Sequence, residues 1–210
     1  MKVLLVNGSP HENGCTYTAL VEVANTLKFE GIEAEIFQLG KKALTGCTAC
    51  FSCMTLKRCV FPDRVNEFLD IAKNADGFIF GSPVHYASAG GATISFMDRV
   101  FFADLMSGAQ TFYLKPAAAV VSARRAGTTS TFDQLNKYFT ISEMPIISSQ
   151  YWNMVHGSKP EDVSQDLEGL QIMRTLGRNM AWFLKCKEVA IKAGIPFPQR
   201  EKRARTNFIR

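Results

Sequence analysis

The sequence predicts an α/β fold in which a doubly wound parallel sheet of five strands carries helices on both faces. Short apolar runs of strand length alternate with segments whose apolar residues recur at helical spacing. The chain has 210 residues, enough for one large domain with a proper core. Strands that alternate with helices give a parallel sheet, and the simplest strand order is 2-1-3-4-5.

The five strands are expected where apolar, mostly β-branched or leucine-rich runs are too short for a helix. The expected strands are 2–6, 34–37, 77–81, 117–121 and 144–147. The last of these contains Pro145, which cannot donate to a central ladder, so we place it at an edge of the sheet.

Helices are expected between the strands. One begins near Gly14 to Thr16, one is opened by Pro62, and the others cover 90–105, 129–140 and 161–192. The last helix stops at Gly194 and Pro196, a common C-terminal signal. We therefore expect one domain over 1–194, with a cysteine-rich insertion at 40–61 and a basic tail at 195–210.

Charge and hydropathy exclude two classes of partner. The net charge is +5, but the tail alone contributes five cations against one acid, which leaves the body near +1. No basic stripe with interleaved aromatic residues suggests nucleic acid. No apolar run could cross a bilayer, and the N-terminus enters a strand without a signal-peptide pattern, so we expect a cytoplasmic protein with no membrane partner.

The helix near 94–106 is apolar over more than one stripe. A helix that is apolar on several faces is buried on several faces. Either the sheet and a long loop cover this helix, or a second subunit does. We favour the subunit and expect a homodimer or homotetramer.

The loop from Asn7 to Thr16 follows the first strand and leads into the first helix. A helix N-terminus presents backbone N–H groups without helical partners, and its dipole favours negative charge. Ser9 and Thr16 add hydroxyl donors, so the loop suits a phosphate. The alternative is a plain βα turn whose glycine and serine only shape the backbone.

The kind of phosphate can be narrowed by exclusion. G-x-x-x-x-G-K-[ST] and G-x-G-x-x-G are both absent. The second strand ends at Gln38 and not at the carboxylate that would hold an adenosine ribose. A flavodoxin-like arrangement is left, in which this loop holds the monophosphate of FMN.

Three other loops leave the carboxyl ends of strands, where ligands bind in sheets of this kind. Residues 82–91 include Pro83, and Tyr86 or His85 could stack on a flat ring. Residues 122–128 contain Arg124 and Arg125, which would stabilise negative charge or bind a phosphate. Residues 149–157 hold two aromatic residues and a histidine that either wall a pocket or pack under the last helix.

Taken together, these motifs resemble the NADPH-dependent FMN reductase and multimeric flavodoxin family. The resemblance rests on Gly8-Ser9-Pro10, Gly14 and Thr16, on Ser82-Pro83-Val84-x-Tyr86, on Asp98-Arg99, and on Arg124-Arg125-x-Gly127-Thr128. His11 stands where many members carry arginine, and Cys15 where many carry asparagine.

The resemblance implies FMN as cofactor, with its phosphate on the first loop and its ring against the second and third. The cofactor-binding residues it implies are Ser9, Pro10, His11, Asn13, Gly14, Cys15, Thr16, Pro83, Val84, His85, Tyr86, Ala87, Ala123, Arg124, Arg125 and Gly127. No catalytic side chain is expected, because FMN carries the chemistry.

Within this family, the four cysteines at Cys47, Cys50, Cys53 and Cys59 are similar to the compact motif of iron–sulfur flavoproteins, which ligate a [4Fe–4S] cluster. Three thiols at two-residue gaps can wrap one face of a cubane, and a fourth can close it. Structural zinc more often uses two distant pairs, and disulfides do not suit a reducing cytoplasm. The cysteines are therefore either cluster ligands or free thiols.

The resulting hypothesis is an FMN-dependent oxidoreductase. Hydride would pass from NADH or NADPH to flavin N5, and electrons would leave, through the cluster if present, to an unidentified acceptor. The alternative is an electron carrier that serves a redox protein partner. A third possibility is a flavin-binding regulatory or scaffold protein without turnover.

Overall fold

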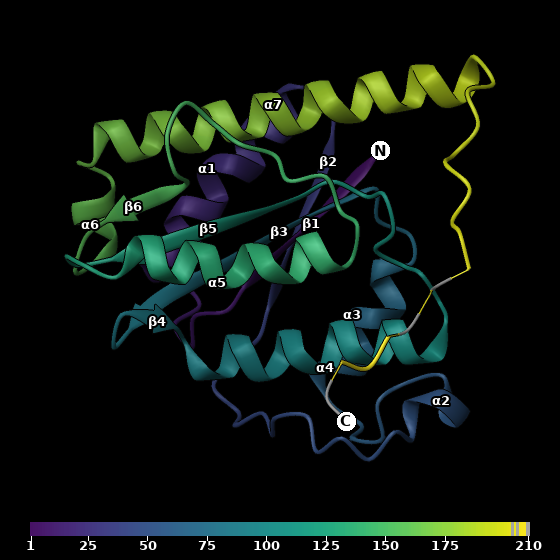
Figure 1. Cartoon of the computed structure of the whole chain (residues 1–210). Helices are drawn as coiled ribbons and strands as arrows, with labels where there is room; N and C mark the ends of the chain where they lie inside the picture. The colour runs from purple at the N-terminus through teal and green to yellow at the C-terminus, as the bar shows by residue number, and fades with distance from the viewer. Residues whose placement is uncertain (203, 205, 209–210) are drawn as a thin grey trace.

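The computed structural model describes residues 1–202, 204 and 206–208 and contains a parallel sheet between two layers of helices (Figure 1). The sheet strands are β1 (Lys2–Asn7), β2 (Glu33–Gln38), β3 (Gly77–His85), β5 (Ala117–Ala123) and β6 (Met154–His156), and β4 (Ser88–Ala89) pairs only with β3. The expected α/β class is confirmed.

The strand order is β2-β1-β3-β5-β6, with every pair in this path parallel. This is the predicted 2-1-3-4-5 order once the short β4 is set aside. Val3 pairs with Ala34 on one side and with Gly77 on the other, which fixes the register of the central strand. The carboxyl ends of β1, β2, β3, β5 and β6 therefore share one edge of the sheet, called here the carboxyl rim.

The fifth strand lies later in the chain than predicted. Segment 144–147 makes only an isolated bridge between Ile146 and Ala117, and the regular strand is β6 at Met154–His156. Both segments lie beside β5, one after the other along this edge of the sheet, with an irregular stretch between them. Pro145 lacks an N–H, and its carbonyl accepts a hydrogen bond from Ala117 at 2.9 Å. The expected edge position is thus right and the expected residues are wrong.

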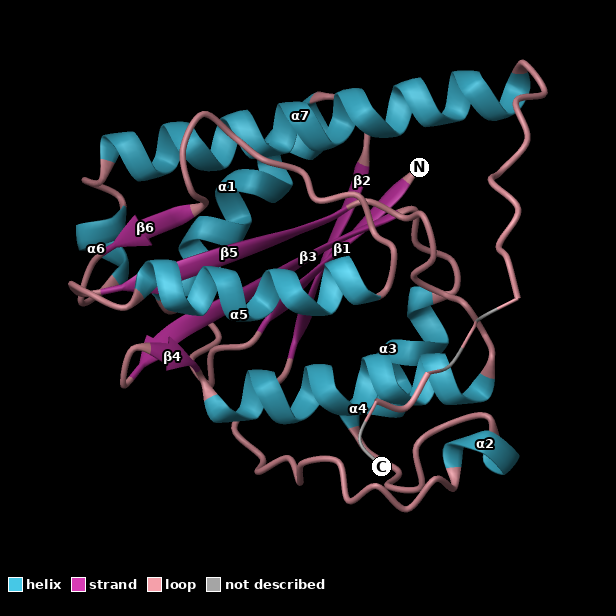
Figure 2. Ribbon diagram, viewed as in Figure 1, coloured by secondary structure: helices cyan, strands magenta, loops and turns pink. Residues whose placement is uncertain are grey.

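The helices cover both faces of the sheet (Figure 2). Val3 and Leu5 of β1 face the layer of α1 (Cys15–Phe29) and α7 (Leu167–Lys192), whereas Leu4 and Val6 face the opposite layer. That opposite layer contains α3 (Arg64–Ala72), α4 (Gly91–Ser107) and α5 (Thr128–Ile141). The alternation follows from the two-residue period of a strand.

The final helix is shorter than expected because it is divided. A short α6 (Pro160–Val163) begins at a proline, and α7 begins after Asp166, whose side chain accepts a hydrogen bond from the Gly169 N–H at 2.9 Å. The residues between the two helices are turns. A four-residue helix, α2 (Cys53–Leu56), also forms inside the cysteine-rich insertion, where we expected only a loop.

The apolar helix α4 is covered by its own chain. Phe101 is 7% exposed and packs on Phe112 with the ring centroids 4.7 Å apart. Phe102 contacts Phe51 of the cysteine-rich insertion, at 5.7 Å between centroids. Of the two alternatives, the sheet and the long loop therefore account for the burial, and the favoured second subunit is not needed for it. Self-association remains a prediction without this support.

The basic tail leaves α7 and packs on the body where it is described. Arg200 forms an ion pair with Glu143 and lies over the ring of Tyr113 at 3.8 Å. Arg203, Arg205 and Arg210, which also make the tail basic, lie outside the described residues. Within the described part of the chain, every helix is too short or too polar to cross a membrane.

Gly177 sets the distance between α1 and α7. A Cβ at this position would lie 2.8 Å from Cβ of Thr26 and 3.2 Å from the Val23 carbonyl oxygen. We expect Gly177→Ala to lower the free energy of unfolding by about 1–3 kcal/mol, because the two helices must move apart. Urea denaturation monitored by circular dichroism measures this.

Gly91→Ala is the matched control for Gly177→Ala. A Cβ at Gly91 meets nothing within 4 Å, and alanine favours a helix by up to about 1 kcal/mol. Unchanged or higher stability is expected for the control. Equal stability of the two variants would show that the contact between α1 and α7 does not depend on the glycine.

Candidate functional site

The loop after β1 is held by a network of buried amides. Asn7 is fully buried, and its Oδ1 accepts a hydrogen bond from the Ser9 N–H at 3.1 Å while its Nδ2 donates to Oε1 of Gln38 at 2.5 Å. Gln38 donates in turn to the carbonyl of Ser9 at 2.7 Å. Gln38, which stands where a ribose-binding carboxylate could have been, therefore braces the loop.

A cavity of about 540 Å³ opens beside this loop at the N-terminus of α1. Gly14 caps the helix without a side-chain hydrogen bond, so its first N–H groups have no side-chain cap. Of the predicted phosphate-site residues, four line the cavity, namely His11, Asn13, Gly14 and Cys15. The cavity has a polar wall next to a positive helix end, an arrangement that attracts anions.

Two lysines at the same cavity were not predicted. Lys41 comes from the start of the cysteine-rich insertion, and Lys159 precedes Pro160 of α6. With Glu12 also present, the side chains that line the cavity carry an excess of positive charge. The sequence contained an indication of where Lys159 would lie, because Pro160 is typical of the first residue of a helix and Lys159 directly precedes it. Lys41 carried no such signal.

Thr16 and Ser9 lie next to the cavity but do not line it. The Thr16 hydroxyl forms a buried hydrogen bond of 2.7 Å with the hydroxyl of Ser122 at the end of β5. The Ser9 hydroxyl accepts a hydrogen bond from the His11 N–H at 3.2 Å. Both hydroxyl groups thus fix the loop to its surroundings in this structure.

The second and third predicted loops pack directly on each other. Tyr86 and Ala87 form the two-residue turn between β3 and β4, both with positive φ, at 51° and 58°. A Cβ on Gly127 would lie 2.7 Å from Cα of Ala87 and 2.8 Å from Cγ1 of Val84, so only glycine allows this approach. Residues 83–87 and 123–127 are brought together as the sequence implied.

The turn is also held by hydrogen bonds with α5. Three side chains of these two loops remain exposed to solvent. Ser130 donates to the Ala87 carbonyl at 2.5 Å, and Gln134 accepts from the Ala89 N–H at 3.1 Å. The Tyr86 side chain is fully exposed. Arg124 and Arg125 are exposed too, and neither forms an ion pair with any residue that the structure describes.

The segment 149–157, which contains β6, contributes backbone and not aromatic walls. The Gly157 carbonyl accepts a hydrogen bond from the Cys15 thiol at 3.5 Å, and burial raises the pKa of that thiol. Tyr151 and Trp152 are about half exposed and contact each other, with their centroids 4.9 Å apart. The sequence left two alternatives open for these side chains, a pocket wall or packing under the last helix. Neither alternative describes two half-exposed rings that contact each other.

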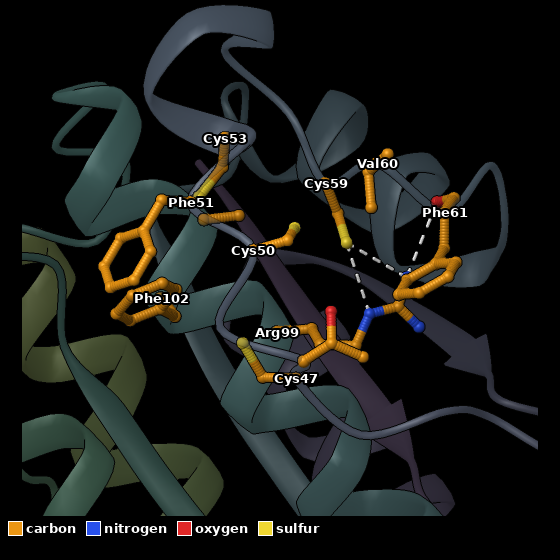
Figure 3. A pocket seen from close by; sticks show the side chains of 11 residues that line it. Cys47, Cys50, Phe51, Cys53, Cys59, Val60, Phe61, Arg99 and Phe102 are labelled. Carbon is orange, nitrogen blue, oxygen red and sulfur yellow. Dashed lines mark hydrogen bonds between the residues drawn. The ribbon is translucent and has the colours of Figure 1, made fainter.

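The four cysteines of the motif line a second cavity, between the cysteine-rich insertion and α4 (Figure 3). Cys47 and Cys50 are exposed, Cys59 is half-buried and Cys53 is buried, and none of these four cysteines forms a disulfide. The enclosed volume is about 20 Å³, so anything larger than a water would need the exposed part of the loop to move outward.

Arg99 of α4 completes this cavity and was predicted only as part of a family motif. Its guanidinium is 1% exposed and donates to the Cys59 sulfur from Nε at 3.3 Å and from Nη2 at 3.2 Å. The backbone of Cys59 is held separately, because Asn66 accepts from its N–H and donates to its carbonyl, both at 2.9 Å. Position 99 could not be joined to position 59 from spacing alone.

The thiols and the backbone suit a sulfur-ligated cluster. Hydrogen bonds from Ser52 lower the pKa of the Cys50 thiol, whereas burial raises that of Cys53. Phe51 has a φ of 57° and is followed by Ser52 in the right-handed region, a pairing that forms the backbone concavities of many iron–sulfur sites.

The donor set, and not the volume of the cavity, favours a cluster over a single metal ion. Among the described residues, no group of three or more His, Cys, Asp or Glu is arranged to hold one ion. A cubane spreads its four thiolate ligands further apart than one ion does, and thiolates are the ligands that it requires. The donor chemistry therefore fits a [4Fe–4S] cluster.

Comparison with known proteins agrees with this geometry. The family model described as NADPH-dependent FMN reductase matches residues 1–159. An iron–sulfur flavoprotein of Methanocaldococcus jannaschii is 33% identical over 191 residues, which cover 88% of this chain and 98% of the relative.

Two solved structures share the fold. A flavodoxin from the domain Archaea aligns over 88% of this chain and 99% of its own, with a TM-score of 0.59 at 16% identity. RosB, solved with 8-demethyl-8-formylriboflavin-5'-phosphate, aligns over 100% and 96% with a TM-score of 0.69 at 13% identity. At these identities the similarity shows the fold alone.

The opposite pKa directions of two cysteines predict their order of reaction in the reduced, metal-free protein. The lowered pKa of Cys50 gives more thiolate at neutral pH, and the raised pKa of buried Cys53 gives less. Iodoacetamide followed by peptide mass spectrometry should label Cys50 before Cys53. Ser52→Ala should slow Cys50 without changing Cys47, and faster labelling of Cys53 than of Cys50 would contradict the prediction.

Proposed function

The chain belongs to the NADPH-dependent FMN reductase family, among the iron–sulfur flavoproteins, and we propose that it passes electrons from NADPH or NADH through FMN to an acceptor. The single observation that carries this proposal is the cavity at the N-terminus of α1, beside the loops where a flavin ring would lie. Membership of this family already makes the chain a flavin-binding oxidoreductase. The nicotinamide donor, the route of the electrons and the acceptor are the proposed part.

The phosphate of FMN would bind in the 540 Å³ cavity. The backbone N–H group of Cys15 supplies a donor at the positive end of α1. Lys41 and Lys159 supply lysine cations beside the loop, which itself contains no lysine or arginine. The dinucleotide fingerprint G-x-G-x-x-G is absent, which favours FMN over FAD.

The ring of FMN would lie against residues 83–87 and 123–127. Their close packing at Gly127 and the hydrogen bond from Ser130 fix this wall before any ligand arrives. Arg124 and Arg125 stand at the same strand end with unpaired charge, and a guanidinium there stabilises an anionic ring or a dinucleotide phosphate. When bound, FMN supplies hydride acceptance and electron transfer in one- or two-electron steps.

Cys47, Cys50, Cys53 and Cys59 would hold a [4Fe–4S] cluster, which carries one electron at a time. The four thiols line one cavity, and the insertion that carries them follows β2 on the carboxyl rim. The insertion leaves the rim and runs along α4 (Figure 1), so the cysteine cavity lies against the middle of that helix, at Arg99, Phe102 and Ala103.

Substitution of Lys159 tests whether the phosphate of FMN binds in this cavity. Lys159→Ala should weaken FMN binding about fivefold, roughly 1 kcal/mol, the scale of one exposed charge interaction. Riboflavin lacks the phosphate, so its affinity should not change, and added salt should reduce the difference for FMN. Lys137→Ala on α5 removes an equally exposed lysine away from the cavity and serves as the matched control. An equal loss for riboflavin would exclude phosphate contact.

The whole proposal is tested on protein prepared without oxygen. FMN, iron and sulfide should all be present, and NADPH or NADH should bleach the flavin absorbance. Cys53→Ala should lose iron and sulfide and keep FMN, because Cys53 lies in the other cavity.

Three outcomes of this experiment would change the proposal. Bound FAD in place of FMN would overturn the phosphate assignment. Protein with FMN but no iron would overturn the cluster. FMN that neither nucleotide bleaches would favour the electron carrier.

A further inference from the structure

The buried guanidinium of Arg99 has more donors aimed at one cysteine than a structural role needs. It makes a two-point ion pair with Asp63, at 2.7 Å from Nη1 to Oδ2 and 2.9 Å from Nη2 to Oδ1. That pair alone would anchor α4 to the start of α3. Nε and Nη2 nevertheless both point at the Cys59 sulfur, as the dashed lines in Figure 3 show.

A neutral thiol is a weak acceptor and makes poor use of two cationic N–H donors. A thiolate is a good partner, because hydrogen bonds to an ionised group are about twice as strong as neutral ones. Among the described residues, Cys59 is the thiol of these four that accepts hydrogen bonds from a buried cation; Cys47 and Cys50 are exposed and Cys53 is buried without such a bond. The site is therefore built for negative charge on this sulfur.

We propose that Arg99 is a positioning residue for electron transfer, whose hydrogen bonds to Cys59 raise the reduction potential of the [4Fe–4S] cluster. This inference rests on the proposed function. When the cluster accepts one electron from a reductant, its charge becomes more negative by one and no proton is needed. Donors that withdraw electron density from a ligand sulfur stabilise the more negative state.

Asp63 makes the inference testable in the opposite direction. Its carboxylate neutralises part of the Arg99 charge, and its side chain is 30% exposed, so the aspartate can be changed with little loss of packing. It also caps α3 by accepting from the Val65 N–H at 3.1 Å. Asparagine is an equally good cap, so Asp63→Asn removes the charge and keeps the helix start.

The experiment is a potentiometric titration of the anaerobic, cluster-loaded protein, followed by electron paramagnetic resonance and normalised to iron content. At the midpoint of the wild type, Arg99→Met should lower the ratio of reduced to oxidised cluster at least about tenfold, which is about 59 mV for one electron. Arg99→Lys, which keeps the charge without the planar fork, should fall between the two. Asp63→Asn should raise the midpoint.

Arg58→Met is the matched control. Arg58 is adjacent to Cys59 in sequence, but its side chain is 55% exposed, so solvent screens its charge and the midpoint should not move. If Arg58→Met lowers the midpoint as much as Arg99→Met does, the effect comes from any nearby positive charge, and the role of Arg99 is overturned.

A purely structural role gives a different pattern. Arg99→Lys and Arg99→Met would then lose iron or melt earlier, while the clusters that remain keep the wild-type midpoint, and the inference falls. If Arg99→Met takes up no iron, the Asp63→Asn variant tests the inference instead. A midpoint of Asp63→Asn that equals or lies below the wild-type value overturns the inference. Wild-type protein that assembles no cluster overturns the proposed cluster and this inference together, whereas a loaded protein with unmoved potentials overturns only the inference.

Discussion

The side-chain amide of Asn7 is the interaction on which the carboxyl rim depends. It lies fully buried at the end of the central strand and joins the loop after β1 to Gln38 at the end of β2. From Gln38 the connection continues to α3, because Arg64 donates to the Gln38 carbonyl at 2.5 Å. A buried amide left without partners costs about 1–3 kcal/mol, so this network is satisfied as a whole or broken as a whole. It ties the anion cavity to the helix that follows the cysteines.

The two cavities differ in how they treat charge. The cavity at α1 is large and open, and its cations are exposed lysines that solvent screens. The cysteine cavity is small, and its cation is a guanidinium buried against a carboxylate. Charge at the first cavity therefore suits the attraction of a soluble anion, whereas in our proposal charge at the second changes the reduction potential of a bound cluster.

The parts of the fold that could be predicted are those fixed by local pattern. The runs at 2–6, 77–81 and 117–121 are buried on both faces, and no alternative structure buries them equally well. The prediction misplaces the fifth strand because both Met144–Ile147 and Met154–His156 lie beside β5, and only the extent of their pairing with β5 distinguishes them. The break before α7 depends on the cap at Asp166, which a continuous helical period conceals.

The site follows the same division. Loop residues such as His11, Asn13 and Gly14 could be predicted because a strand, a loop and a helix are consecutive in the chain. Lys41, Lys159 and the contact between Arg99 and Cys59 join segments far apart in sequence, and no spacing rule reaches across them.

The turn at Tyr86 and Ala87 has a consequence for the entropy of binding. Turns with two left-handed residues normally use Asn-Gly, and a non-glycine residue in that region costs about 1–2 kcal/mol. Here the hydrogen bonds from α5 hold the strained backbone in place while the Tyr86 ring stays in solvent. The backbone freedom of this wall is lost during folding and not during binding. A planar molecule that reaches the ring restricts only side-chain rotations, so more of the contact energy remains as affinity.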